Sequence, residues 1–137
     1  MSIIYPMGLL AIFTLLYSSV LITVRKKAVA SGDIKPSYFK EYNNDTPPSY
    51  MQKATRQWSN LYEVPVLFYA VCAAILALRL DDMIFTYMAY SFFGLRLVQS
   101  FIHTTYNNVY HRLLIFSCGM VTVLAMWVRL LLNVDMA

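Results

Sequence analysis

Charged residues are scarce in this 137-residue chain: Asp, Glu, Lys and Arg make up 13% of it, whereas hydrophobic residues make up 59%. Soluble domains usually carry about a quarter charged residues. The few charges gather in short stretches and leave long apolar runs between them. A soluble helical bundle needs a polar outer face on every helix, and such faces are missing here. The scarcity therefore excludes a soluble fold and indicates that lipid surrounds most of the chain.

The motifs of common enzyme and metal sites are also missing. The two cysteines, Cys72 and Cys118, lie inside apolar runs without the spacing of a metal or redox motif. We interpret both as buried thiols that pack as small hydrophobic residues. No Cys/His cluster indicates a metal, no glycine-rich loop indicates a nucleotide, and no Ser-His-Asp set indicates a hydrolase. Any chemistry must therefore come from the few polar residues elsewhere.

Four apolar runs are long enough to cross a membrane, which takes about 20 apolar residues for about 30 Å of hydrocarbon. They cover residues 3–24, 57–79, 83–103 and 113–132. The first run has no basic residue ahead of it and no small-residue cleavage site, so we interpret it as a retained span. The sequence therefore predicts an all-α integral membrane four-helix bundle in which residues 1–137 form one domain.

The connection between the first two runs, residues 25–55, is long. Within it, Asp45-Thr46-Pro47-Pro48 has a capping side chain followed by prolines that suit a first helical turn. The second helix should therefore begin near Pro48, outside the membrane. The other connections are short, and the one at Arg79-Leu80-Asp81-Asp82 requires an antiparallel hairpin.

The basic residues set the expected orientation. In or beside the first connection lie Arg25, Lys26, Lys27, Lys35, Lys40, Lys53 and Arg56. Loops of up to about 60 residues that are rich in Lys and Arg stay in the cytoplasm. This connection should therefore be cytoplasmic and both termini outside. The net charge of +4 then fits contact with anionic lipid headgroups. Nucleic acid is not an expected partner, because the basic residues flank the spans.

Two groups of polar residues interrupt the apolar runs, each at a spacing that puts its members on one helix face. They are Arg56, Asn60 and Glu63, spaced i, i+4, i+7, and Arg96, Gln99 and His103, spaced i, i+3, i+7. An ionisable side chain inside a span costs several kcal/mol unless it is paired or hydrated. Both groups should therefore face each other or a neighbouring subunit, with Arg112 at the same depth.

The chemistry of these residues suits a small zwitterion with more negative than positive charge. Guanidinium groups grip carboxylates through two parallel hydrogen bonds, and a carboxylate such as Glu63 can hold an ammonium group. An amide such as Asn60 either binds the ligand or joins two helices. Pro65 removes the hydrogen bond to the Leu61 carbonyl and should kink the helix. The kink either opens space beside Glu63 or is a tolerated membrane proline.

The charged residues also have structural interpretations. Glu63 and Arg96 could form an ion pair that holds the helices together, and Arg56 and Arg112 could anchor the chain at the membrane interface. His103 could be a hydrogen-bonded core histidine. An ion pair needs only two residues, whereas both polar groups and Arg112 gather at one depth. The collection therefore favours a ligand site.

One segment, Arg56-Gln-Trp-Ser-Asn60-Leu-Tyr-Glu63-Val-Pro65, has an arginine, an asparagine four residues on, a glutamate three further and a nearby proline. Another is Arg96-Leu-Val-Gln99-Ser-Phe-Ile-His103, followed by Tyr106-Asn107-Asn108 and Arg112. These segments resemble the second helix, and the third helix with the start of the fourth, of the MAPEG family, the membrane-associated proteins in eicosanoid and glutathione metabolism. The basic run Arg25-Lys26-Lys27 fits as well.

The resemblance implies a homotrimer of four-helix protomers that binds glutathione between neighbouring subunits near the cytosolic face, without a metal. The residues implied to bind glutathione are Arg56, Asn60, Glu63, Arg96, Gln99, His103 and Tyr106. Arg112 corresponds to the family's catalytic arginine, which stabilises the nucleophilic glutathione thiolate. A lipophilic second substrate would reach this thiolate from the bilayer.

The sequence departs from the eicosanoid-forming members at three positions. His103 stands where some carry tyrosine, Gln99 stands where one carries histidine, and Pro65 lies closer to the glutamate, as in bacterial members. The resemblance therefore implies a protein of the bacterial inner membrane that uses glutathione as transferase or peroxidase on lipophilic electrophiles or hydroperoxides. The alternatives are a non-enzymatic lipid-binding or partner-presenting protein on the same scaffold, and a small transporter using Glu63 and His103.

Overall fold

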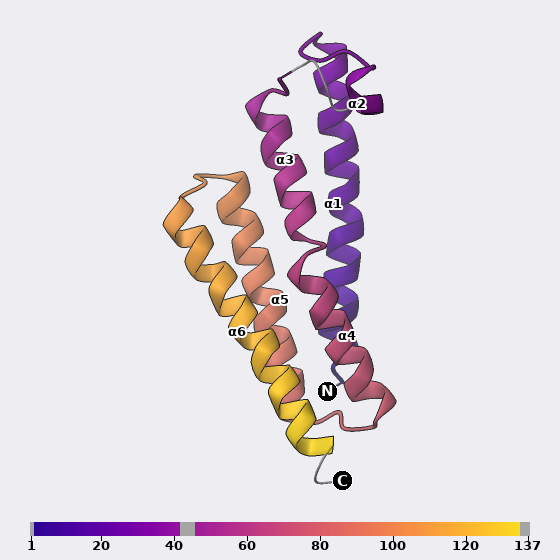
Figure 1. Ribbon diagram of the computed structural model, residues 1–137, viewed down its shortest axis with the longest axis vertical. Helices are drawn as coiled ribbons and strands as arrows, with labels where there is room; N and C mark the ends of the chain where they lie inside the picture. Colours follow the sequence, from indigo (N-terminus) through magenta and orange to yellow (C-terminus); the bar gives the residue numbers. More distant parts are fainter. Residues whose placement is uncertain (1, 42–45, 135–137) are drawn as a thin grey trace.

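The computed structural model describes residues 2–41 and 46–134, and all regular structure within those residues is helical. The helices are α1 (Ile4–Ala30), α2 (Tyr38–Glu41), α3 (Ser49–Asn60), α4 (Val64–Ala77), α5 (Met83–Thr104) and α6 (Val109–Val134). Figure 1 shows α3 and α4 following one another beside α1, with α5 and α6 paired alongside. The start of α1 and the end of α6 lie at one end of the molecule, and residues 31–41 and 46–48 of the first connection lie at the other. The all-α prediction is confirmed.

Three stretches are long and apolar enough to cross a membrane: Ile4–Ala30, Ser49–Ala77 and Val109–Val134. They contain most of the first and second predicted spans and the whole of the fourth. The third, in α5, is not among them, because polar residues such as Arg96 and Gln99 lower its mean hydropathy. The membrane assignment is confirmed, whereas a count of four spans stays a prediction.

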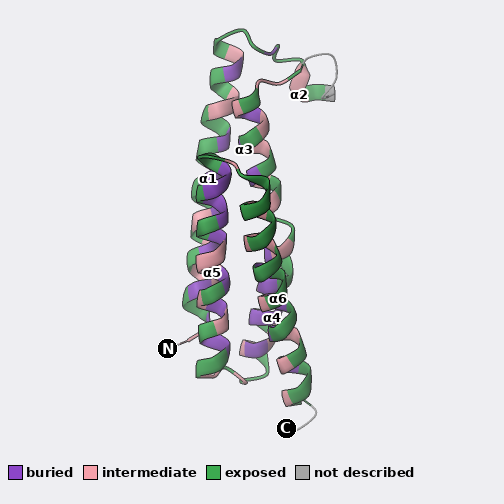
Figure 2. Ribbon diagram, turned by 90° about the vertical axis from the view of Figure 1, so that its left-hand side faces the viewer, coloured by how far each residue is buried: buried purple, intermediate pink, exposed green. Residues whose placement is uncertain are grey.

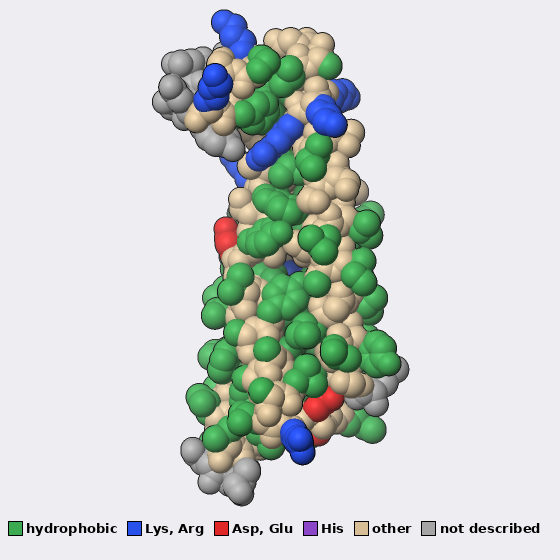
Figure 3. Space-filling view, turned by 90° about the vertical axis from the view of Figure 1, so that its right-hand side faces the viewer, with side chains coloured by type: hydrophobic (Ala, Val, Ile, Leu, Met, Phe, Trp, Pro, Cys, Tyr) green, Lys and Arg blue, Asp and Glu red, His purple; other side chains and the backbone are tan. Residues whose placement is uncertain are grey.

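The outer surfaces of the long helices are apolar. Leu15 and Leu16 of α1 are both 65% exposed, and Val121 of α6 is 63% exposed. Buried positions line the inward sides of the helices in Figure 2, and hydrophobic side chains are spread along the middle of the molecule in Figure 3. Apolar surface of this extent does not suit water, and it fits a bilayer.

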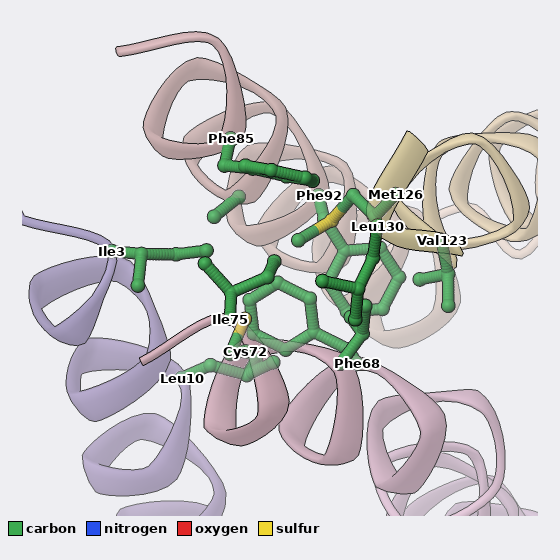
Figure 4. Close-up of a cluster of buried hydrophobic side chains, with 12 residues drawn as sticks. Ile3, Leu10, Phe68, Cys72, Ile75, Phe85, Phe92, Val123, Met126 and Leu130 are labelled. Atoms are coloured by element: carbon green, nitrogen blue, oxygen red, sulfur yellow. The ribbon is translucent and has the colours of Figure 1, made fainter. Parts of the chain in front are cut away.

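The core lies between α1, α4, α5 and α6. Its buried residues are Ile3, Leu10, Phe68, Val71, Cys72, Ile75, Phe85, Ala89, Phe92, Val123, Met126 and Leu130 (Figure 4). Phe68 of α4 and Phe92 of α5 stack with ring centroids 4.5 Å apart. This contact joins α4 to α5.

One cysteine differs from its prediction. Cys72 is a buried free thiol, as predicted, but Cys118 is exposed. The buried side of α6 runs through Gly119, Val123 and Met126. Cys118 precedes Gly119 by one residue, about 100° around the helix, and therefore lies outside the packed face.

Polar contacts fix the end of the molecule opposite the first connection. Asp82 caps α5 by accepting a hydrogen bond from the Phe85 amide (2.8 Å), and both of its oxygens accept hydrogen bonds from Arg129 (2.9 and 2.6 Å). The Arg129 hydrogen bonds hold the pKa of the Asp82 carboxyl below its ordinary value. Asp81 accepts a hydrogen bond from the Ile3 amide (3.3 Å). These contacts tie the starts of α1 and α5 to the end of α6.

The first connection is shorter than residues 25–55. Helix α1 continues to Ala30, and α3 begins at Ser49 after Pro48, as predicted. Asp45, the predicted cap, lies outside the described residues. Asp33 accepts hydrogen bonds from the Tyr50 hydroxyl (2.7 Å) and from Ser31 (3.0 Å), which ties the turn after α1 to the start of α3.

Candidate functional site

The site begins where α3 and α4 are separated by a complete break instead of a kink. The Leu61 and Tyr62 amides still bond to carbonyls of α3, and the chain then turns at Glu63 (φ −77°, ψ −90°) before α4 starts at Val64. Pro65 has no N–H to donate to the Leu61 carbonyl and sits in the first turn of α4, where that lack is tolerated. As a result, the Glu63 side chain is exposed.

A cavity of about 300 Å³ lies between this break, α5 and the first turns of α6. It is lined by Asn60, Glu63, Gln99, Val109, Arg112, Leu113 and Phe116. Its four polar lining residues were all predicted as site residues, and they come from both polar groups and from α6. The structure therefore brings Asn60, Glu63, Gln99 and Arg112 together.

Arg112 is held at the cavity by the turn before α6. The Asn108 side chain caps α6 by accepting hydrogen bonds from the Tyr110 and His111 amides (2.9 and 3.2 Å). Asn107, in the left-handed region at φ 50°, accepts a hydrogen bond from Arg112 Nη1 (2.9 Å). Arg112 Nε is buried and has no hydrogen-bond partner in the described part of the chain. Asn107 therefore fixes one side of the guanidinium at the cavity wall.

Arg96 lies behind the cavity instead of lining it. It is 2% exposed, and its Nη1 donates to Gln99 Oε1 (2.5 Å). Its guanidinium lies 4.8 Å from the Phe92 ring centroid and 5.5 Å from that of Phe116. A Cβ on Gly119 would meet Arg96 Nη2 at 3.5 Å, so this glycine leaves room for the guanidinium. Arg96 therefore acts on the cavity through the Gln99 amide.

Glu63 and Arg96 do not form the ion pair considered as a structural alternative. Among the described residues, the salt bridge found is that of Arg129 with Asp82. The Glu63 charge is still close enough to act on the Arg96 guanidinium electrostatically. The Glu63 carboxylate is therefore not paired with Arg96, and it lines the cavity.

Three other predicted site residues do not line this cavity. Arg56 is exposed and lines a separate hollow of about 400 Å³ that also includes Arg25. His103 is 1% exposed, with Nε2 3.0 Å from the Lys53 carbonyl oxygen of α3, which matches the core-histidine interpretation. Tyr106 is 57% exposed and its hydroxyl lies 3.0 Å from His111 Nδ1.

Sequence reasoning missed the apolar wall of the cavity and a buried contact near it. Val109, Leu113 and Phe116 follow helical spacing on the Arg112 side of α6, a signal that could have identified them. Gln57 is 1% exposed, and its Nε2 donates to Ser100 Oγ (2.8 Å), joining α3 to α5. Gln57 follows Arg56 by one residue and so lies on a different face of the helix from the first polar group. The spacing that identified this group therefore could not identify Gln57.

The arrangement offers one carboxylate, one guanidinium and two amides around a small cavity with an apolar wall. The model of the MAPEG family matches residues 3–132 of the chain. Neither the comparison with curated proteins nor the comparison with solved structures gave a match. The matched range includes every predicted site residue, from Arg56 to Arg112, and confirms the resemblance seen in the motifs.

Proposed function

The chain belongs to the MAPEG family, a membrane family that includes glutathione-dependent transferases and peroxidases as well as other members, and from that premise we propose that it binds and uses glutathione. The observation that carries the proposal is the cavity at which Glu63, Gln99, Asn60 and Arg112 meet. Its volume of about 300 Å³ is at the lower end for small-molecule pockets. A neighbouring subunit would complete it.

Glutathione has two carboxylates, one ammonium group and a thiol. The single carboxylate and single guanidinium of the cavity suit the ammonium group and the thiol, and the two glutathione carboxylates would need cations from outside this lining. Glu63 would hold the ammonium group, while Asn60 and Gln99 would bind the peptide groups. Arg112 would lie beside the sulfur. An opposite charge within about 4–6 Å lowers a pKa by about 1–3 units, so a thiol of ordinary pKa near 8.5 would be largely a thiolate at neutral pH.

The proposed reaction is nucleophilic attack by that thiolate. An electron pair of the sulfur forms the new C–S bond with an electrophilic carbon, and the displaced group leaves with the electrons of the broken bond. Arg112 stays protonated throughout and stabilises the thiolate before the attack. The apolar residues Val109, Leu113 and Phe116 form the side from which a lipophilic substrate would approach.

Membrane placement supports a site shared between copies. Arg56 and Glu63 are both exposed on a single chain, and hydrocarbon would be an unfavourable environment for Glu63. We expect a homotrimer in the bacterial inner membrane, with α5 as the fourth span and its polar residues Arg96, Gln99 and His103 buried inside. The first connection would face the cytoplasm and the termini the outside.

A non-enzymatic lipid-binding or partner-presenting role is the second candidate. It is favoured by the position of Arg56 and Tyr106, which lie away from the cavity although the family resemblance implies that they bind glutathione. Such a protein could keep the scaffold without activating a thiol. This candidate predicts glutathione binding without thiolate formation, or no binding at all.

The two candidates are separated by ultraviolet difference spectroscopy on the purified protein in detergent. Addition of glutathione should produce the absorbance of a thiolate at neutral pH, and the methyl thioether of glutathione should bind without it. Calorimetry on the same samples measures the binding itself. Binding without the thiolate absorbance would contradict the enzymatic proposal and favour the second candidate. Absence of binding would contradict the proposal that the protein binds glutathione.

A further inference from the structure

A second, larger hollow lies at the other side of the molecule, between the last turns of α1 and the short helix α2. It has a volume of about 650 Å³ and is lined by Ile22, Arg25, Lys26, Val29, Ala30 and Phe39. The five α1 residues follow the spacing i, i+3, i+4, i+7, i+8, so they form one helix face. We call this hollow the α1–α2 groove.

The α1–α2 groove lies where the apolar run of α1 gives way to basic residues. The apolar run of α1 ends at Val24, and Ile22, one turn before the basic residues, is 52% exposed. Arg25 of α1 and Arg56 of α3 are the basic residues nearest the apolar runs 3–24 and 57–79, and because they line one smaller hollow they stand at the same level. In Figure 3, basic side chains lie where the upper end of the molecule meets its apolar middle. One end of the groove thus borders hydrocarbon and the other borders headgroups.

The polar end of the groove is cationic. Arg25 and Lys26 line it, and its lining contains no acidic side chain in the described part of the chain. The Arg25 guanidinium lies 5.6 Å from the Phe39 ring centroid. Its Nε is buried without a hydrogen-bond partner among the described residues. The Asp33 carboxylate, in the turn after α1, already accepts hydrogen bonds from Ser31 and Tyr50.

We propose that the α1–α2 groove binds one anionic phospholipid, with the headgroup phosphate at Arg25 and Lys26 and an acyl chain along the exposed side of Ile22. An arginine fork suits two phosphate oxygens, and Phe39 holds the guanidinium in place from the other helix. An apolar residue and two cations on one face match the two halves of a phospholipid. The site is separate from the glutathione cavity and does not depend on the proposed enzymatic function.

The test uses the full chain in detergent and native mass spectrometry with added dioleoyl phosphatidylglycerol or dioleoyl phosphatidylcholine. Lys26→Gln and Lys27→Gln form a matched pair, because both side chains are exposed, both changes remove one charge, and only Lys26 lines the groove. Each basic residue near an anionic lipid strengthens binding about fivefold. Phosphatidylglycerol should therefore bind about fivefold more weakly to Lys26→Gln and equally well to Lys27→Gln.

A stronger variant, Arg25→Gln with Lys26→Gln, should weaken binding about 25-fold, and Arg25→Lys with Lys26→Arg should retain it. Equal binding of phosphatidylcholine, or an equal loss in Lys27→Gln, would overturn the proposal. Displacement of the lipid by millimolar inorganic phosphate would assign the site to a free anion and overturn it too. Lipid bound to the monomer but absent from the oligomer would show that a second copy of the chain covers the groove. That result would also overturn the proposal.

Discussion

Replacement of Arg112 by alanine tests the proposed mechanism most directly. The change removes the cation that lines the cavity while leaving Glu63, Asn60 and Gln99 in place. If Arg112 lowers the pKa of the bound thiol by about two units, from about 8.5 to about 6.5, its loss reduces the thiolate fraction at pH 7 from about 76% to about 3%. The amount of thiolate should then fall about 25-fold, and turnover should fall by less than this factor because a thiolate of higher pKa is more nucleophilic. Loss of direct charge stabilisation during the attack would add to this.

The assay is turnover of glutathione with an aryl chloride in detergent, measured as kcat and kcat/KM across pH. Arg112→Ala should shift the acid limb of the kcat profile at saturating glutathione upward by about two pH units, in line with the higher pKa of the bound thiol. Arg112→Lys keeps the charge and should retain part of the activity. Glutathione binding to Arg112→Ala by calorimetry checks that the fold and cavity survive. Unchanged turnover, or an unshifted pH profile, would remove Arg112 from the mechanism.

Three further predictions concern binding and stability. Glu63→Gln should weaken glutathione binding about tenfold or more by calorimetry, because it removes a charged hydrogen-bond partner of the ammonium group. Asp82→Asn keeps a capping side chain but loses the ion pair with Arg129, so thermal unfolding should show a loss of about 0.5 kcal/mol, and Asp82→Ala a loss of about 1.5 kcal/mol. Because the folded pKa of Asp82 is lowered, its contribution should be present above about pH 4 and disappear as the pH falls through the folded pKa. Gly119→Ala should be tolerated, since its Cβ would meet Arg96 at an ordinary 3.5 Å, whereas Gly119→Leu should destabilise by about 1–3 kcal/mol through overpacking.

Each of these has a result that contradicts it. Glutathione bound equally by Glu63→Gln would place the ammonium group elsewhere. Equal stability of Asp82→Asn and Asp82→Ala would mean that the cap on α5 contributes nothing. A Gly119→Leu protein as stable as Gly119→Ala would show that the space between α5 and α6 is not filled by the Arg96 guanidinium.

The elements that follow from local chemistry could be predicted from the sequence. Apolar runs set the membrane helices, and Pro48 marks the start of α3. Pro65 was predicted to disturb the second helix, and a missing N–H explains why. The helix breaks completely because the backbone also turns at Glu63. Helical periodicity in the sequence does not reveal such a turn.

The positions of individual site residues could be predicted only in part. Spacing put Arg96, Gln99 and His103 on one face, and all three are buried. Spacing does not decide which of them reaches a cavity, because that depends on the register between neighbouring helices. Gln99 meets α6 at the cavity, whereas His103 lies against the α3 backbone at Lys53. Cys118 was misjudged for the same reason, since a uniformly apolar helix does not show which side it packs.

The α3–α4 break and Glu63 together explain why this site needs a covered or water-filled surface. Irregular backbone at membrane depth is tolerated only where protein buries it or where it lines an aqueous cavity. The break at residues 61–63 falls inside the predicted span 57–79, and it places an exposed carboxylate at the same point. A charged side chain that faces lipid is unfavourable even away from the bilayer centre. A bundle selected for stability alone would have removed both features, so their coincidence at one cavity favours a polar ligand held between copies of the chain.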